Sequence, residues 1–478
     1  MAGSVNPWLL GLLALTALRL AAAALLPLAP DEAYYWVWGR DLQPGYLDHP
    51  PMVALWTAAG TALLGDNALG IRLLGPVGLA LATLAVAGAG DALFPERRPG
   101  RWAALLLNAM PLTNAGAVLM TPDTPLFVFW CLSLWAVARL HASGNGRWWL
   151  AVGAFAGCAL LSKYTAALLG AGLLLWLLAE PSARRWWRDG RLYLGGAIAA
   201  LAFLPVVAWN AAHGWASFVK QGGRAGAGTE FGPRFVLELV GGQFALASPV
   251  LLILCAAGTG LAVAAWARRD GGAGLLAALV LPAALVFLWQ ATGSRVQGNW
   301  PAVLYPAACI AAAAFAAPRL QSVGAWIGGG MTLAILLQAG FSPIALPRSA
   351  DPTLARLAGW PGLARDVEVA RAAAGVGFVA AEEYGLAAEL ALHLPPGVPV
   401  VAISGRWDLF TLPEPPVGRT GLMLRSLRRG EGAPLWPGAT PMGEVVRSRD
   451  GTEAERYRLF RVETPPGREP AALLPRPR

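Results

Sequence analysis

Residues 148–179, WWLAVGAFAGCALLSKYTAALLGAGLLLWLLA, decide the fold class of this chain. The run is almost continuously apolar, and a single helix needs only about 20 apolar residues to cross a bilayer. It is too long for one crossing, and only Ser162-Lys163-Tyr164 interrupts it. The sequence therefore predicts two short transmembrane helices that meet at Lys163.

The composition of the whole chain agrees with a membrane protein. Of the 478 residues, 56% are hydrophobic and only 14% are charged, whereas soluble domains carry about 25% charged residues. The net charge is +9, but the basic residues lie mostly in short loops between apolar runs, as expected beside anionic lipid headgroups. This distribution argues against nucleic acid as a partner.

The apolar runs predict a polytopic α-helical membrane protein with about eleven transmembrane helices. The first run lacks the basic leader of a signal peptide and is long enough to span, so we interpret it as a retained helix. The predicted spans lie near residues 8–28, 68–91, 102–120, 124–141, 148–161, 165–180, 192–211, 245–266, 273–291, 300–317 and 324–345.

The composition changes after about Arg348, where charged residues and prolines become frequent. We predict a transmembrane core over 1–347, with a first outer loop over 29–67, and a small α/β domain over 348–464. Helices are expected over 354–374 and 382–393, and short strands over 376–380, 398–403 and 421–424. The Pro-rich segment 465–478 is predicted to be disordered.

Basic residues orient the core. With the N-terminus in the cytoplasm, the inner loops and their flanks hold twelve arginines and the outer loops hold six basic residues. This bias agrees with the positive-inside rule and places the α/β domain outside. The inner arginines are Arg97, Arg98, Arg101, Arg139, Arg147, Arg184, Arg185, Arg188, Arg191, Arg268, Arg269 and Arg319.

The first outer loop opens with two acids, Asp31 and Glu32. A carboxylate pair at membrane depth is costly unless it is paired or faces a wet cavity. We predict that Asp31 is catalytic and that Glu32 binds substrate, with one acid facing the site and the other supporting it. Alternatively, Asp31 is only a helix N-cap, and the aromatic residues around Tyr35 form an interfacial belt instead of a sugar-binding platform.

The same loop ends in Asp48-His49-Pro50-Pro51. The two prolines favour an extended conformation at Asp48 and His49, and Pro51 suits the first turn of a helix over roughly 52–64. The free N–H groups of that helix would favour an anion such as phosphate. We therefore predict that Asp48 is catalytic and that His49 binds substrate, although Asp48 as a mere N-cap stays open.

Lysine is rare enough to stand out, because only two of the 37 basic residues are lysines. Lys163 is predicted to bind a phosphate, with a snorkelling lysine as the alternative. Lys220, in a Gly-rich outer loop with Arg224 and Arg234, could close over an anion, but we favour a solvated loop.

Four further residues complete the predicted substrate-binding set: Asp123, Tyr164, Arg295 and Asn299. Arg295 is an outer arginine, which suggests a phosphate or carboxylate partner. No segment has the spacing of a metal-binding motif. A divalent metal is nevertheless possible, with Asp48, His49 and His213 as candidate ligands, while the sequence requires no cofactor.

Several blocks together resemble glycosyltransferase family 39, the relatives of dolichyl-phosphate-mannose–protein mannosyltransferases and of the aminoarabinose transferase that modifies lipid A. The first-loop blocks DEAYYW and YLDHPP carry the resemblance, and TPDTP, LSKYT and QGNWP resemble later blocks. The similarity covers roughly residues 5–345.

The resemblance implies a GT-C fold with an extracytoplasmic active site and inverting transfer from a polyprenyl-phosphate sugar. It assigns the two first-loop acids to Asp31 and Asp48, and it places Lys163 near the lipid phosphate. Family members with a lysine after the second acid differ from this chain, which has His49 there. The sugar and the acceptor, whether lipid, protein or cell-envelope glycan, stay open, as does the choice of base between the two acids.

An alternative function from another class is a transporter or flippase of lipid-linked sugars. That class predicts charged residues near the bilayer midplane and broken helices in two corresponding halves. Here the polar residues gather at one face and no twofold repeat is visible, so transfer is favoured over transport.

Overall fold

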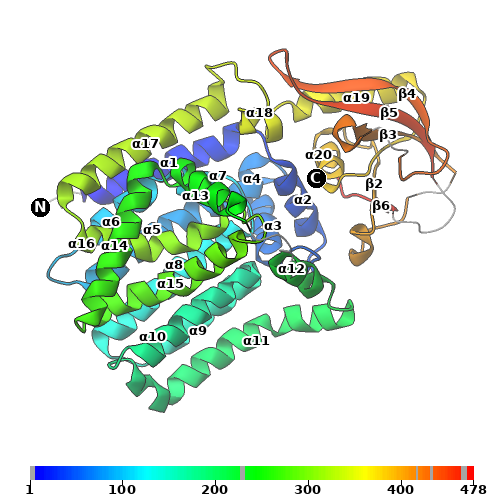
Figure 1. The fold of residues 1–478 in the computed structure, drawn as a ribbon. Helices are drawn as coiled ribbons and strands as arrows, with labels where there is room; N and C mark the ends of the chain where they lie inside the picture. The colour runs from blue at the N-terminus through cyan, green and yellow to red at the C-terminus, as the bar shows by residue number, and fades with distance from the viewer. Residues whose placement is uncertain (1–5, 227–231, 416–417, 431–433, 465–470) are drawn as a thin grey trace, which may run out of the picture. The chain divides into compact units, whose positions relative to one another are not determined.

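The computed structural model describes residues 6–226, 232–415, 418–430, 434–464 and 471–478, and the chain forms two compact units (Figure 1). The helical unit comprises Met1–Ala21, Pro44–Val53 and Leu74–Leu336. The mixed unit comprises Ala22–Gln43, Ala54–Leu73 and Leu337–Arg478. The predicted boundary near residue 347 therefore differs from the observed division, because two segments of the predicted core pack with the C-terminal part.

Three helices run from one unit into the other: α1 (Pro7–Leu25), α3 (Met52–Leu64) and α17 (Pro318–Phe341). The remaining helices of the helical unit are α5 (Leu74–Leu93), α6 (Gly100–Ala109), α7 (Pro111–Val118), α8 (Asp123–Ser143), α9 (Trp148–Ser162), η1 (Tyr164–Ala166), α10 (Ala167–Ala179), η2 (Arg184–Arg188), α11 (Gly190–Ala212), α12 (Ala216–Gly226), α13 (Arg234–Leu246), α14 (Pro249–Ala267), α15 (Gly271–Ala291), η3 (Trp300–Leu304) and α16 (Tyr305–Phe315).

Among the described residues, seven helices are long and apolar enough to cross a bilayer: α1, the segment Ala68–Leu93 that includes α5, and α8, α11, α14, α15 and α17. Each corresponds to a predicted span. The predicted spans at 148–161, 165–180 and 300–317 are shorter apolar helices. The prediction of a multi-pass helical membrane protein is therefore confirmed, although several crossings are shorter than the sequence suggested.

The predicted span 102–120 is two helices, α6 and α7, that meet at Met110. Pro111 begins α7, and a proline cannot donate the backbone hydrogen bond that would continue α6. Asn114 Nδ2 instead donates to the Asn108 and Met110 carbonyls, at 2.8 and 2.9 Å. The break is therefore built into the sequence at Pro111.

The run that decides the fold class is divided as predicted. Helix α9 ends at Ser162, Lys163 has extended backbone (φ −161°), and η1 and α10 follow. Helix α9 packs against α8 and α11, and Gly153 and Gly195 allow the close approach to α11. A Cβ at Gly153 would lie 2.1 Å from the Gly195 carbonyl oxygen, so only glycine fits there.

The mixed unit contains a six-stranded sheet in the order β4-β5-β3-β1-β2-β6. Strand β1 pairs in parallel with β2 and β3, and the other pairs are antiparallel. The strands are β1 (Phe378–Ala381), β2 (Val400–Ile403), β3 (Thr420–Ser426), β4 (Thr440–Arg449), β5 (Thr452–Glu463) and β6 (Ala471–Leu473), and the helices are α2 (Pro30–Arg40), α4 (Ala68–Arg72), α18 (Pro352–Arg356), α19 (Trp360–Ala373), α20 (Tyr384–His393), η4 (Trp407–Leu409) and η5 (Leu427–Arg429).

Two predictions for the C-terminal part need correction. The charged, amphipathic segments that form β4 and β5 were not predicted as strands, because their exposed faces interrupt the apolar pattern. The expected disorder of 465–478 is wrong for residues 471–478, while residues 465–470 lie outside the described residues. Val401 of β2 pairs with Leu473, and Arg476 donates to carbonyls at the end of α20.

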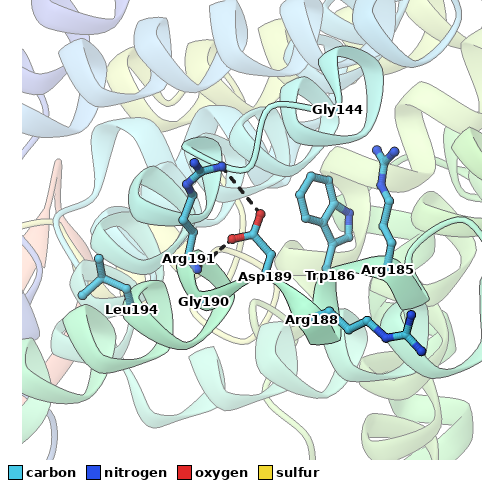
Figure 2. Close-up of a pocket in the computed structure, with 8 residues that line it drawn as sticks. All are labelled: Gly144, Arg185, Trp186, Arg188, Asp189, Gly190, Arg191 and Leu194. Carbon is cyan, nitrogen blue, oxygen red and sulfur yellow. Dashed lines mark hydrogen bonds and ion pairs between the residues drawn. The ribbon is translucent and has the colours of Figure 1, made fainter.

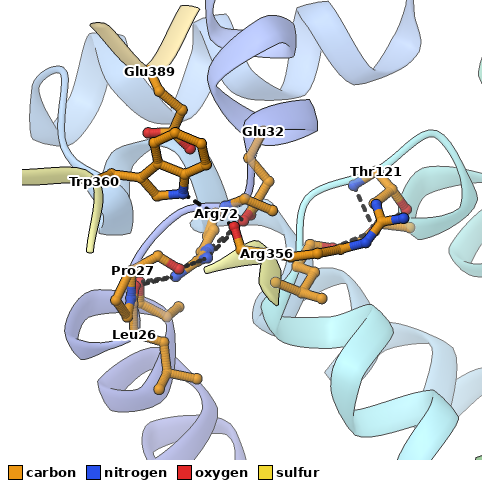
Figure 3. Close-up of polar contacts among 12 residues, drawn as sticks. Leu26, Pro27, Glu32, Arg72, Thr121, Arg356, Trp360 and Glu389 are labelled. Carbon is orange, nitrogen blue, oxygen red and sulfur yellow. Dashed lines mark hydrogen bonds and ion pairs between the residues drawn. The ribbon is translucent and has the colours of Figure 1, made fainter. Parts of the chain in front are cut away.

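In the mixed unit, the buried arginine Arg72 binds the carbonyl groups at the end of α1 (Figure 3). The last carbonyl groups of a helix have no partner within it. Arg72 donates to the carbonyls of Ala23 and Leu26 at 3.1 and 2.6 Å, and to that of Pro27 at 2.8 Å. Its Nε and Nη2 bind the two carboxylate oxygens of Glu32 at 2.7 and 2.6 Å.

The pair thus fixes the passage from α1 into α2, because Glu32 also accepts from the backbone N–H of Ala29 at 2.9 Å. Both side chains are almost fully buried, with exposed fractions of 0% for Arg72 and 1% for Glu32. A buried pair of this kind is costly to break, since the partner that is left keeps an uncompensated charge.

We predict that Arg72→Met lowers the free energy of unfolding by about 3–5 kcal/mol, because Glu32 and three carbonyls lose their partner. Chemical unfolding of the purified protein in detergent measures the change. Arg101→Met, which removes an exposed arginine, serves as the matched control. Equal stability of the two variants would contradict a structural role for the buried pair.

Candidate active site

Three segments that are far apart in the sequence meet at Asp123 in the helical unit. Asp123 begins α8, Lys163 is the C-cap residue of α9, and Asn299 precedes η3. Lys163 Nζ lies 2.7 and 2.8 Å from the two carboxylate oxygens of Asp123, and Asn299 Nδ2 donates to Asp123 Oδ2 at 2.7 Å. The structure therefore brings three of the predicted site residues together.

The environment of Lys163 excludes a snorkelling lysine. The residue is only 6% exposed, and Trp300 places its ring centroid 5.3 Å from Nζ. An ammonium removed from water needs an opposite charge, which Asp123 supplies. The Asp123 side chain keeps 17% of its surface exposed, so this charged pair borders accessible space.

A second acid–lysine pair joins Asp48 to Lys220. Lys220 Nζ lies 2.6 Å from Asp48 Oδ1, and the neighbouring Gln221 side chain donates to the Asp48 carbonyl. Residues 47–49 form a bend, closed by a 3.2 Å hydrogen bond from Tyr46 N to the His49 carbonyl, and not the extended segment expected from the prolines. The helix expected after Pro51 is confirmed as α3.

Helix α12 links the two acid–lysine pairs. Tyr164, next to Lys163, shares a hydrogen bond of 2.7 Å with Ser217 Oγ on α12. Ser217 and Lys220 are three residues apart and therefore lie on the same side of that helix. The polar groups of the two pairs are thus connected within one unit by Tyr164 and one turn of α12.

Lys220 is a site residue to which the sequence interpretation gave no role. The Gly-rich surroundings favoured a solvated loop, but residues 216–226 are helical and the Lys220 side chain is only 24% exposed. The available signal was its rarity, because Lys163 and Lys220 are the only lysines of the chain. The structure pairs each of them with a predicted site acid.

The metal candidates do not form a metal site in the described part of the chain. The Asp48 carboxylate faces an ammonium, and His213 Nδ1 lies 2.7 Å from the Trp209 carbonyl with its ring stacked on the indole. Within the described ranges, no three His, Cys, Asp or Glu side chains come together in a way that could hold a metal ion.

The remaining predicted cations lie apart from these pairs. Arg295 has a carboxylate partner, as its position suggested, but the partner is Glu238 and the arginine side chain is 69% exposed. Arg234 lies over the Phe235 ring at 5.5 Å, and the side chain of Arg224 lies outside the described residues.

Asp31 belongs to the mixed unit and receives its contacts from the C-terminal part of the chain. Tyr384, the first residue of α20, donates its hydroxyl to Asp31 Oδ1 at 2.8 Å, and Arg356 Nη1 lies 3.9 Å from Oδ2. The Asp31 side chain is 37% exposed. The N-cap of α2 is Ala29, so Asp31 is not merely a capping residue.

Tyr384 was not identified from the sequence, because nothing local connects a residue of the C-terminal domain with the first loop. Arg406 covers its ring at 4.2 Å, which fixes the orientation of the phenol toward Asp31.

Glu32 does not have the position expected of a substrate-binding residue. Arg72 binds both of its carboxylate oxygens, and neither faces solvent. The related expectation, that one of the two acids faces outward and the other gives support, agrees with the exposed Asp31 and the buried Glu32.

Burial raises the pKa of Glu389 on α20, and the charge of Glu32 adds to that increase (Figure 3).

Tyr35 lies in a buried aromatic cluster instead of a belt or an open sugar platform. It is 7% exposed and packs edge-on against Trp38 at 5.0 Å. Tyr34 beside it contacts Tyr384 and Trp407, at 4.6 and 5.4 Å between ring centroids. These rings form the core between α2 and α20 within the mixed unit.

Sequence comparisons agree with the blocks that meet in the helical unit. The model of the family described as dolichyl-phosphate-mannose-protein mannosyltransferase matches residues 48–209. The lipid A galacturonosyltransferase RgtD of Rhizobium johnstonii is 30% identical over 293 residues, which are 59% of this chain and 59% of that protein. The undecaprenyl phosphate-alpha-4-amino-4-deoxy-L-arabinose arabinosyl transferase of Pseudomonas aeruginosa is 30% identical over 198 residues, 37% of this chain and 34% of that protein.

The fold has a solved counterpart along nearly its whole length. The structure of ArnT from Cupriavidus metallidurans bound to undecaprenyl phosphate aligns with a TM-score of 0.64 and 15% identity, covering 96% of this chain and 98% of that one. This likeness shows a GT-C fold and confirms the fold class expected from the sequence. Over residues 48–209 the chain is similar to the dolichyl-phosphate-mannose–protein mannosyltransferases, and it spans 59% of the galacturonosyltransferase and 34% of the arabinosyl transferase that it matches.

Proposed function

We propose that this protein is an inverting membrane glycosyltransferase that moves a sugar from a polyprenyl phosphate to an acceptor hydroxyl. The observation that carries the proposal is the joining of Asp48–Lys220 and Asp123–Lys163–Asn299 through Tyr164 and α12. Two lysines beside carboxylates and next to accessible space suit the binding of a lipid phosphate.

The structural and sequence relatives support this donor class. The Cupriavidus metallidurans protein was crystallised with undecaprenyl phosphate, and the name of the Pseudomonas aeruginosa relative specifies an undecaprenyl-phosphate sugar. A leaving polyprenyl phosphate carries developing negative charge, which preorganised cations stabilise in the transition state. Some members of the family carry a lysine directly after the second acid, where this chain has His49. Here Lys220 brings an ammonium to Asp48 from another helix instead.

We assign the general base to Asp31. Asp48 and Asp123 each face a lysine ammonium at 2.6–2.7 Å, whereas Asp31 accepts from a phenol and has its nearest cation among the described residues, Arg356, 3.9 Å away. Its partly exposed carboxylate is therefore the more available one for the proton of an acceptor hydroxyl. A single displacement then forms the new glycosidic bond as the bond to phosphate oxygen breaks, with no glycosyl-enzyme intermediate.

We further propose that the reaction takes place on the extracytoplasmic face of a bacterial-type inner membrane. Support comes from the arginine bias of the inner loops. One of these loops, with Arg147, joins the end of α8 to the start of α9, opposite to Asp123 and Lys163. The acceptor is a lipid, protein or cell-envelope glycan. Lipid A is the first acceptor to test, because the name of the Rhizobium johnstonii relative specifies it.

We predict that Asp31→Asn lowers the transfer rate by roughly 10²- to 10⁴-fold, the usual contribution of a general base. Asp48→Asn should lose less, because its carboxylate faces Lys220. Membranes that contain each variant are incubated with labelled polyprenyl-phosphate sugars, and labelled product is measured. Asp366→Asn, at an exposed acid of the same unit as Asp31, is the control. Undiminished transfer in both Asp31→Asn and Asp48→Asn would overturn the mechanism.

We predict that Lys163→Met and Lys220→Met each raise the KM for the donor about tenfold or more, since a charge-assisted hydrogen bond contributes about 1.5–3 kcal/mol. Steady-state transfer at varied donor concentration measures this effect. Arg234→Met, which removes an exposed cation of the same unit, should leave KM unchanged. Donor KM values that respond equally to all three substitutions would show that only diffuse charge matters.

Tyr384→Phe tests the positioning of the base. Loss of the phenol hydroxyl removes the hydrogen bond that orients the Asp31 carboxylate, so kcat should fall about tenfold while donor KM stays constant. Steady-state transfer at varied donor concentration measures both constants. An unchanged kcat, or a fall in kcat together with a higher donor KM, would contradict a positioning role for Tyr384.

A further inference from the structure

A cationic pocket lies in the helical unit, away from the candidate active site (Figure 2). It is an open cavity of about 550 Å³ between the α8–α9 turn, η2 and the start of α11. Its lining comprises Gly144, Arg185, Trp186, Arg188, Asp189, Gly190, Arg191 and Leu194. Three arginines against one acid give the pocket an excess of positive charge.

The three guanidinium groups differ in their partners. Arg191 is partly neutralised by Asp189, whose Oδ2 lies 3.6 Å from Nη1. Arg185 lies over the Trp186 ring at 4.6 Å, which orients the group without cancelling its charge. Within the described residues, the Arg188 guanidinium has no recorded hydrogen bond or ion pair. Two guanidiniums are therefore available to an anion.

The pocket and the candidate site occupy opposite ends of the same helices. Asp123 begins α8 and Gly144 ends it, so the pocket lies about 30 Å along that helix from the acid. Trp187 and Tyr193 are exposed beside the arginines. Exposed aromatic and basic residues at helix ends are typical of the headgroup level of a membrane.

An apolar track continues from the pocket along α11. Leu194 lines the cavity, and Leu201 and Leu204 follow on the same helix at spacings of seven and three residues. These spacings place the three side chains on neighbouring positions of one face. All three are more than half exposed, at 53%, 67% and 55%, as expected for lipid-facing side chains of a candidate membrane span. The track suits an acyl chain.

We propose that this pocket binds the phosphate of an anionic phospholipid. The exposed Arg185 and Arg188 side chains, which extend in different directions in Figure 2, would turn onto the phosphate oxygens, and an acyl chain would lie along α11. Guanidinium groups pair with phosphate oxygens through two parallel hydrogen bonds, which a concave site can orient. Free phosphate has the same headgroup chemistry, but it would leave the leucine track unused. The site is independent of the sugar transfer proposed above.

The test uses the purified full chain reconstituted with phosphatidylglycerol and phosphatidylcholine, and lipids retained on the protein are counted by native mass spectrometry. Wild type should retain phosphatidylglycerol in preference. Arg185→Gln/Arg188→Gln should reduce that retention by about tenfold or more, because each basic residue near an anionic headgroup adds to the attraction. Arg268→Gln/Arg269→Gln removes two exposed arginines of another inner loop and should retain phosphatidylglycerol as wild type does.

The outcomes separate a built site from diffuse charge. Equal losses in the two double variants, or equal retention of both lipids by wild type, would overturn the proposal. In a second arm, inorganic phosphate is added to lipid-free protein in detergent and its binding is followed by ³¹P NMR. Phosphate binding that depends on Arg185 and Arg188, without preferential lipid retention, would identify free phosphate as the ligand and also overturn it. Arg188→Gln alone removes an exposed side chain and keeps the test decisive if the double variant does not fold.

Discussion

A charge that is removed from water must meet an opposite charge, and this constraint organises both units of the protein. Glu32, Asp48 and Asp123 each face a basic side chain at 2.6–2.7 Å, and each pair joins segments that are distant in the sequence. Asp31 is the exception among the predicted acids, because its close partner is a phenol. Pairing therefore distinguishes the three acids that compensate a basic side chain from Asp31, to which we assign the acceptance of the proton.

Much of the fold could be predicted, because apolar length and proline are local signals. The run over 148–179 divides at Lys163, as expected from the single polar interruption, and α3 begins directly after Pro51. The sequence also identified Asp123, Lys163 and Asn299 as separate candidates. That they share one carboxylate was not predictable from spacing, because three different helix ends bring them together.

The features that were missed depend on long-range contacts. Lys220 looked solvated because glycines surround it, but α12 forms and carries it to Asp48. Tyr35 looked accessible because its segment reads as a membrane-interface sequence, whereas α20 buries the aromatic cluster. Strands β4 and β5 escaped prediction because a sheet with one exposed face carries alternating charge. In each of these cases, contacts between segments that are distant in the sequence determined the structure, and the local composition did not reveal it.

The central claim is that the protein cleaves the bond between a sugar and a polyprenyl phosphate. The most direct measurement follows both parts of the donor in proteoliposomes that contain the purified chain, a doubly labelled polyprenyl-phosphate sugar and a hydroxyl acceptor. The account predicts that free polyprenyl phosphate and glycosylated acceptor appear in equal amounts, with inversion at the anomeric carbon. An intact donor that only changes leaflet would contradict the account and identify a transporter of lipid-linked sugars.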